Sequence, residues 1–154
     1  QDNATPSGSA LATTVLLKLT ALTGESRYDD AALHALATVS PLLGRYPAGF
    51  AQWLCAAAFD LSEPHEVALI GPADDPRLKE LQAVLLETYR PFVVLAQGAD
   101  GPADAAVPLM QHRLMVDGSP AAYVCRRFIC RQPVTAPDLL RQELRRSSPP
   151  VAAD

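Results

Sequence analysis

Two cysteines near the C-terminal end of the chain have the residue type and spacing that most directly suggest chemistry. Cys125 and Cys130 are separated by four residues, and a pair of thiolates can exchange disulfides or bind zinc. On one continuous strand, residues five positions apart point to opposite faces and lie roughly 16 Å apart, beyond the roughly 7 Å between Cα atoms that a disulfide tolerates. Only a sharp bend at Arg126-Arg127 would bring the two sulfurs together. The sequence therefore favours two structural cysteines, with a redox pair as the alternative.

The histidines do not supply the further ligands that a metal site would need. A zinc ion bound by the two cysteines would require two more ligands, and His34, His65 and His112 show no paired spacing. Residues 71–75 lie between a predicted strand and a predicted helix, where a phosphate-binding loop would be expected. They contain one glycine and two carboxylates that would repel a phosphate. We therefore expect no metal ion and no cofactor.

The charge pattern argues against nucleic acid as a partner. Seven arginines give residues 113–154 a net charge of +3, but acidic residues are interspersed and the isoelectric point of the chain is near 5.3. The arginines are Arg113, Arg126, Arg127, Arg131, Arg141, Arg145 and Arg146. A solvated or interdomain surface explains them better than a nucleic-acid interface.

Composition also predicts the compartment. The three cysteines are an odd number, and Cys55 lies inside an apolar helical pattern, so they do not form the even, dense framework of a small secreted domain. No apolar stretch approaches the roughly 20 residues of a membrane-spanning helix. We expect a cytoplasmic protein without a membrane partner. The polar start, without an initiator Met or a signal segment, is typical of a fragment of a larger protein.

The first part of the chain predicts two antiparallel helices. The first begins at a cap, Ser7 or Ser9, and ends at Gly24. Its apolar stripe consists of Leu11, Val15, Leu19 and Leu22. The second helix begins at a Ser26 cap and carries apolar residues as far as Leu43. The link between them is so short that the two helices must run in opposite directions.

A third predicted helix, from Pro47 to Leu61, has almost no polar side. Gln52 and Asp60 are its polar side chains, and the remaining positions are nearly all apolar. The apolar periodicity of this helix predicts that Trp53 packs in the core and does not stack on a sugar. We expect this helix to be wrapped by protein nearly all round, which two neighbouring helices alone cannot achieve.

The second part of the chain predicts a strand, a helix and a second strand. The apolar run 67–71 and the run 92–96 have the composition of buried strands. Between them, Asp75 and Pro76 form a strong helix start. Such a βαβ unit normally pairs its strands in parallel. A third strand is expected at 121–125 and a last helix from Pro137 onward.

Three segments together resemble a known family. They are residues 2–8 (DNATPSG), residues 65–81 and residues 123–135 (YVCRRFICRQPVT). They look like the C-terminal end of the thioredoxin-domain-containing proteins related to spermatogenesis-associated protein 20. In that family, a thioredoxin-like N-terminal domain precedes a long six-hairpin (α/α) barrel similar to glycosidases and N-acylglucosamine 2-epimerases.

The resemblance implies an α+β fragment that completes a larger protein. Residues 1–62 would be the last helices of the barrel, 63–146 a small βαβ-containing α/β segment, and 147–154 a disordered tail. The partners would be the rest of the parent chain, namely the barrel and the thioredoxin-like domain. The fragment itself would be inactive, and any action on carbohydrate would belong to the parent. The alternative is a non-catalytic interaction module that self-associates as a homo-oligomer.

Two candidate sites follow from the same resemblance. Loops at helix starts border the substrate pocket of such barrels, so Asp2 or Asn3 would bind a sugar hydroxyl. Cys125 and Cys130 would exchange thiols with the thioredoxin-like domain. The usual segment of the family is Pro-Ser-Gly-Asn-Ser. The Asn is missing here, because Ser9 follows Gly8 directly.

Overall fold

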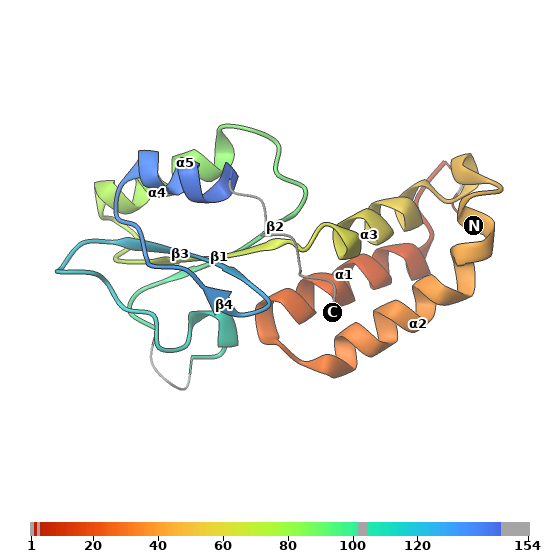
Figure 1. Cartoon of the computed structure of the whole chain (residues 1–154), viewed down its shortest axis with the longest axis horizontal. Helices are drawn as coiled ribbons and strands as arrows, with labels where there is room; N and C mark the ends of the chain where they lie inside the picture. Colours follow the sequence, from red (N-terminus) through yellow and green to blue (C-terminus); the bar gives the residue numbers. More distant parts are fainter. Residues whose placement is uncertain (1, 3, 102–104, 146–154) are drawn as a thin grey trace, which may run out of the picture.

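Helices and sheet occupy opposite ends of the molecule. The computed structural model describes residue 2, residues 4–101 and residues 105–145. Figure 1 shows three helices side by side at one end and a sheet with two further helices at the other. The α+β class that the sequence predicts is confirmed. The predicted tail, residues 147–154, lies outside the described residues.

The first helix, α1 (Gly8–Thr23), begins and ends where the sequence predicts. The hydroxyl of Ser7 accepts a hydrogen bond from the backbone N–H of Ala10 at 3.3 Å, which satisfies one of the free donors of the first turn. Gly24 ends the helix with φ at 72°, in the left-handed region that glycine adopts without strain.

The buried face of α1 differs from the predicted stripe. Its buried residues are Ala10, Thr13, Leu17 and Ala21, whereas Leu11 and Val15 are about half exposed. In Figure 1, α1 lies between the other two helices of this end, and small side chains let its neighbours approach closely. Because of this central position, the face with small residues is buried and the larger Leu11 and Val15 remain outside.

The next two helices do not begin at the residues predicted. The second, α2 (Ser26–Leu43), starts at Ser26 itself, so the N-cap is Glu25 and the predicted Ser26 cap is wrong. Pro47 opens only a 3-10 turn, η1 (Pro47–Gly49), and the α-helix α3 (Ala51–Leu61) follows. Trp53 is buried in the core, as predicted.

One face of α3 is apolar and exposed, contrary to the expectation that this helix is wrapped all round. We call this face the α3 stripe. It consists of Ala51, Leu54, Cys55, Ala58 and Leu61, all exposed. Leu61 is 82% exposed. None of the helices in the described part of the chain has the length and apolarity needed to cross a lipid bilayer.

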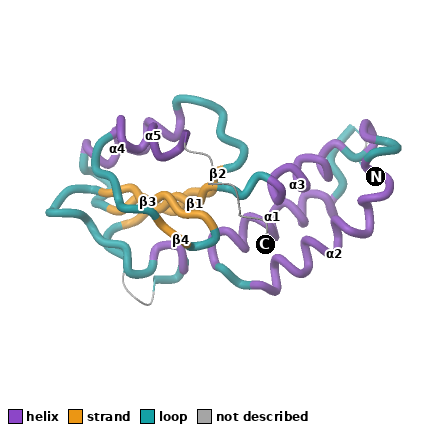
Figure 2. Tube along the Cα trace, in the orientation of Figure 1, coloured by secondary structure: helices purple, strands orange, loops and turns teal. Residues whose placement is uncertain are grey.

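The sheet has four strands within the described residues, in the order β2-β1-β3-β4 (Figure 2). Strand β1 (His65–Ile70), helix α4 (Pro76–Leu86) and strand β2 (Val93–Gly98) form the predicted unit, and the two strands are parallel. Strand β3 (Ala121–Arg126) runs antiparallel to β1, and β4 (Ile129–Cys130) runs antiparallel to β3. Asp75 caps α4 by accepting the backbone N–H of Arg77 at 2.8 Å.

The two faces of the sheet are covered differently. Helices α4 and α5 (Pro137–Arg145) pack on one face, where Leu69, Leu81 and Leu140 are completely buried. The 3-10 turn η2 (Pro108–Met110) covers the other face, together with Leu22 of α1. Val94 of β2 is part of the core of the three helices. The helical end and the sheet therefore share buried side chains.

Candidate functional site

A tight hairpin at the end of the sheet brings the two predicted cysteines together. Strands β3 and β4 are joined by Arg127 and Phe128, which both have positive φ, 48° and 62°. Two-residue hairpin turns of this kind normally use Asn-Gly or Asp-Gly, because other side chains are strained there. The register pairs Cys125 directly with Cys130. The sharp bend that the two cysteines need in order to meet is therefore present, one residue later than Arg126-Arg127.

Cys125 and Cys130 form a disulfide. Their sulfurs are 2.07 Å apart and their Cα atoms 3.9 Å apart, because the turn at Arg127 and Phe128 folds the segment back on itself. The preference for two separate structural cysteines on opposite faces is thus wrong. A redox role for the pair stays a prediction at this point. Cys55, on the α3 stripe, is free and exposed.

A partly buried arginine, Arg113, lies beside this disulfide. Nη2 of Arg113 is 2.7 Å from Sγ of Cys130 and 3.7 Å from Sγ of Cys125. Its Nη1 donates to the carbonyl of Gln111 at 2.7 Å, and its Cζ lies 5.9 Å from the ring centre of Tyr123. Burial lowers the pKa of Arg113, although a guanidinium stays charged under ordinary conditions. A positive charge is therefore held directly against the disulfide.

A buried carboxylate, that of Glu66, lies opposite Cys125 on the neighbouring strand. Glu66 of β1 pairs with Cys125 of β3, and it is only 4% exposed. Its Oε2 accepts the backbone N–H of Phe128 at 2.8 Å, which holds the turn of the hairpin. Burial raises the pKa of Glu66 above its usual 4.5, and this hydrogen bond and the charge of Arg113 only partly offset the effect.

Replacing Glu66 with glutamine should stabilise the protein at neutral pH, because burial disfavours the charged carboxylate in the folded chain. The pKa of Glu66 is higher in the folded than in the unfolded chain. At pH values between these two pKa values, the folded chain therefore binds more protons than the unfolded chain. The stability that Glu66 contributes is complete below the unfolded pKa and is lost as the pH rises through the folded pKa. The amide keeps an oxygen for the N–H of Phe128 and has no charge to bury.

Urea denaturation at pH 4 and pH 7.5 measures this effect. The variant should gain stability at the higher pH and differ little from the original at the lower one. The exposed Glu80 of α4 provides the control, because Glu80→Gln should change the stability by less than about 0.5 kcal/mol at both pH values. A Glu66→Gln protein that is less stable than the original at pH 7.5 would contradict the assignment.

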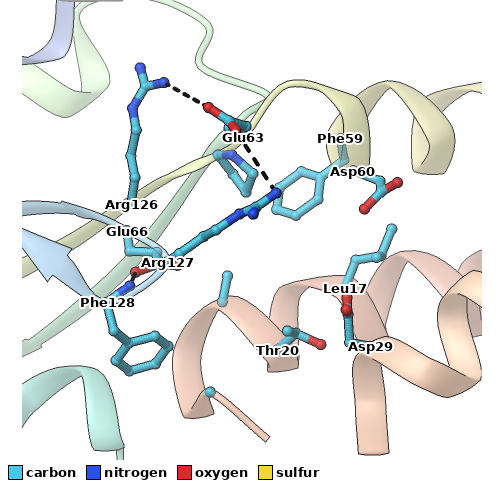
Figure 3. Close-up of a pocket in the computed structure, with 13 residues that line it drawn as sticks. Leu17, Thr20, Asp29, Phe59, Asp60, Glu63, Glu66, Arg126, Arg127 and Phe128 are labelled. Carbon is cyan, nitrogen blue, oxygen red and sulfur yellow. Dashed lines mark hydrogen bonds and ion pairs between the residues drawn. The ribbon is translucent and has the colours of Figure 1, made fainter. Parts of the chain in front are cut away.

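A cavity of about 420 Å³ lies beside the hairpin, between it and the helices (Figure 3). Its walls come from the end of α1, the first turn of α2, the end of α3, the start of β1 and the hairpin turn. The lining residues are Leu17, Thr20, Ala21, Gly24, Asp29, Phe59, Asp60, Glu63, Pro64, Glu66, Arg126, Arg127 and Phe128. This volume is in the range of small-molecule sites.

The polar lining of this cavity is a set of carboxylates with two guanidinium groups. Figure 3 shows Glu63 between Arg126 and Arg127, with 3.8 Å between charged atoms in each pair. Asp60 and Asp29 lie on the helical side. Burial raises the pKa of Asp60, and the neighbouring Asp29 adds to the effect, whereas Arg127 opposes it. Such a lining can form hydrogen bonds with a polar molecule.

Asp2, which the sequence predicts as a site residue, is not among the residues that line this cavity. Asp2 is buried, and its two carboxylate oxygens accept the backbone N–H groups of Ser7 at 2.8 Å and Gln52 at 2.9 Å. The bond from Ser7 is the main reason that the pKa of Asp2 lies below its usual value. Asp2 therefore joins the start of α1 to the start of α3. Its role in binding a sugar stays a prediction, and Asn3 lies outside the described residues.

The described residues offer no metal site: no three His, Cys, Asp or Glu side chains come close enough to hold an ion. Several of the arginines take part in ion pairs. Arg131 pairs with Glu143 at 3.5 Å, and Arg141 pairs with Glu87 and Asp138. The pairs with Arg131 and Glu87 join α5 to the segment after β4 and to the end of α4, whereas the pair of Arg141 with Asp138 lies within α5.

Sequence reasoning missed Glu66 and Arg113. A glutamate in a strand that is otherwise apolar, as in the run 65–70, is the one signal that could have identified Glu66. Nothing in the sequence distinguishes Arg113 from the other arginines, because its position depends on the long loop before β3.

Comparisons with known proteins support the resemblance at a low level of identity. No family model matches the sequence, and neither does any solved structure. Spermatogenesis-associated protein 20 from Homo sapiens is 24% identical over 147 residues, and the protein of that name from Rattus norvegicus is 25% identical over 150 residues. Each match covers 94% of this chain but only 19% of the relative. The chain is thus similar, over nearly its whole length, to about a fifth of spermatogenesis-associated protein 20.

Proposed function

We propose that this chain is a non-catalytic C-terminal module of a larger protein and that it docks through the α3 stripe against helices of that protein. The observation that carries the proposal is the orientation of α3. A surface helix normally turns its polar residues to the solvent. In α3, the exposed side is the apolar one.

The polar residues of α3 point toward the rest of the chain. Nε2 of Gln52 donates to the hydroxyl of Thr14 in α1 at 3.0 Å, and Asp60 lines the cavity described above. Both are partly buried, whereas Leu54 and Leu61 are exposed. Leu11 and Val15 add exposed apolar surface on α1. An arrangement of this kind is typical of a helix that has a further layer of protein on its outer side.

The occupant that we propose is a helical layer of the parent chain. The chain corresponds to about 19% of the length of its relatives, so such a parent would have ample length to supply it. An (α/α) barrel would place helices against the α3 stripe, and this is what the family resemblance implies. Carbohydrate binding or processing would then belong to the larger protein and not to this chain. A thioredoxin-like domain would be a further part of the same parent.

Two substitutions on the α3 stripe test the proposal. The isolated chain should enhance the fluorescence of the apolar dye ANS, and Leu54→Gln combined with Leu61→Gln should remove more than about half of that signal. Leu86→Gln is the matched control, because Leu86 is 77% exposed but lies at the end of α4. This control should leave the signal unchanged.

Sedimentation at several concentrations separates the proposal from its alternative. If the chain is a monomer and binds the dye through the α3 stripe, the result supports docking of the α3 stripe against another part of the same polypeptide. A concentration-dependent dimer that the double substitution abolishes would assign the α3 stripe to self-association instead. Dye binding that is the same in both variants would remove the reason for proposing a docking surface on α3.

A further inference from the structure

We propose that the Cys125–Cys130 disulfide is a thiol–disulfide exchange site, in which Cys130 is the exchanging sulfur and Arg113 stabilises its thiolate. The substrate class is a dithiol, of either a small molecule or a protein. The proposal is independent of the docking role of the α3 stripe, since it concerns residues of the sheet and of the loop before β3 and none of α3. It rests on the unequal burial of the two sulfurs and on the position of the guanidinium.

The two cysteines differ in access. Cys125 lies in the middle of the sheet and is 1% exposed, whereas Cys130 is only partly buried on the short strand β4. Strand β4 is the edge of the sheet. An attacking thiolate therefore has better access to Cys130 than to Cys125.

The guanidinium of Arg113 fits a thiolate better than it fits a disulfide. A disulfide sulfur is neutral and a weak acceptor, yet Nη2 of Arg113 is in contact with Sγ of Cys130. Nε of the same side chain is buried without a hydrogen-bond partner among the described residues. A partly buried charge is costly unless opposite charges offset its loss of hydration, and the nearby Glu66 offsets it only in part. Reduction supplies a further opposite charge at the sulfur that Arg113 already touches.

The backbone holds Arg113 in place independently of the disulfide. The N–H of Gly101 donates to the carbonyl of Arg113 at 2.7 Å. A Cβ atom at position 101 would come within 1.7 Å of the carbonyl oxygen of Met110, so only glycine allows this approach. The side chain is further held by the carbonyl of Gln111. Arg113 is thus positioned before any thiolate forms.

The exchange reaction consumes the two thiols of one external dithiol. One external thiolate attacks Sγ of Cys130, the bond between the two protein sulfurs breaks, and its electron pair stays on Cys125. Cys125, 3.7 Å from Nη2 of Arg113, then takes up a proton from water. A second external thiolate attacks the external sulfur of the mixed disulfide and releases Cys130 as a thiolate beside Arg113. The external dithiol is oxidised to a disulfide, and the protein disulfide is reduced to two cysteines.

Two titratable groups also face this centre. The carboxylate of Glu66 attracts the guanidinium of Arg113 and competes with the thiolate for it, whereas Tyr123 lies under the guanidinium on β3. Neither supplies a positive charge. Arg113 is therefore the group whose removal should change the chemistry of Cys130 most.

The first test measures the redox equilibrium of the whole chain in glutathione buffers, with alkylation and mass spectrometry to count free thiols. Arg113→Gln should make the disulfide about tenfold harder to reduce, a shift of about 30 mV to more negative potential. Arg131→Gln is the matched control, because Arg131 adjoins Cys130 in sequence but pairs with Glu143. It should leave the potential unchanged. An Arg113→Gln protein with the original potential, or a higher one, overturns the proposal.

The second test needs no variant and therefore does not depend on whether Arg113→Gln folds. In the reduced chain, the alkylation rates of Cys130 and Cys55 are followed against pH by peptide mass spectrometry, with the exposed Cys55 as the internal reference. The profile of Cys130 should reach half of its maximum at a pH at least about one unit below that of Cys55. Profiles that coincide, or a reversed order, contradict thiolate stabilisation at Cys130.

Discussion

Replacing Leu81 with alanine is expected to lower the free energy of unfolding by about 3 kcal/mol. Leu81 is 0% exposed and lies in α4 against the sheet, where Leu69 and Leu140 also pack. Truncation removes the buried methyl groups and leaves a cavity that the rigid sheet cannot fill by relaxing. Leu86→Ala, at an exposed position of the same helix, should change the stability by less than about 0.5 kcal/mol.

The single tryptophan makes this experiment more informative. Trp53 lies in the helical core, far along the chain from Leu81, so its fluorescence reports the helical end. Because Val94 joins that core to the sheet, the Leu81→Ala transition should shift equally when followed by fluorescence and by circular dichroism. A fluorescence transition that does not move would mean that residues 1–62 and 63–146 unfold as separate units.

Replacing Phe59 with alanine should lower the free energy of unfolding by about 4 kcal/mol. Phe59 is buried in α3, within the core of the three helices, and its ring also forms part of the cavity wall in Figure 3. Loss of the ring should therefore both loosen the helices and enlarge the cavity. Denaturation by guanidinium chloride, followed by circular dichroism, measures the change.

Tyr89 is the matched control for Phe59. It is an aromatic residue of similar size that is 91% exposed, and Tyr89→Ala should leave the stability within about 0.5 kcal/mol of the original. If Phe59→Ala were equally harmless, the packing of α3 against α1 would not be a major source of stability. The docking surface proposed for α3 would then lack a firm support.

Local signals in the sequence were sufficient to predict most elements. Ser7, Gly24 and the pair Asp75-Pro76 define helix ends through hydrogen bonds and backbone angles that depend on a few neighbouring residues. The βαβ unit follows from two apolar runs on either side of a helix. Side-chain burial was less predictable, because Leu11 and Val15 have the periodicity of a core and are exposed.

The candidate site could not be predicted from local signals. Arg127 and Phe128 are poor turn residues, so the hairpin depends on support from elsewhere, namely the disulfide and the carboxylate of Glu66. The hydrogen bond between Glu66 and Phe128 joins residues 62 positions apart in sequence. Arg113 reaches the disulfide only because a loop closes on Gly101. Contacts of this kind are set by the tertiary structure.

The contact between Gly24 and Phe128 couples two positions that are distant in sequence. A Cβ atom at position 24 would lie 3.2 Å from the ring of Phe128, and the backbone of Gly24 also has a positive φ of 72°. Phe128 in turn occupies the strained turn of the hairpin. A larger residue at 24 is therefore tolerable only if the ring at 128 becomes smaller or moves. The two positions should behave non-additively in a double-mutant cycle, so the helical end and the sheet cannot diversify independently at this junction.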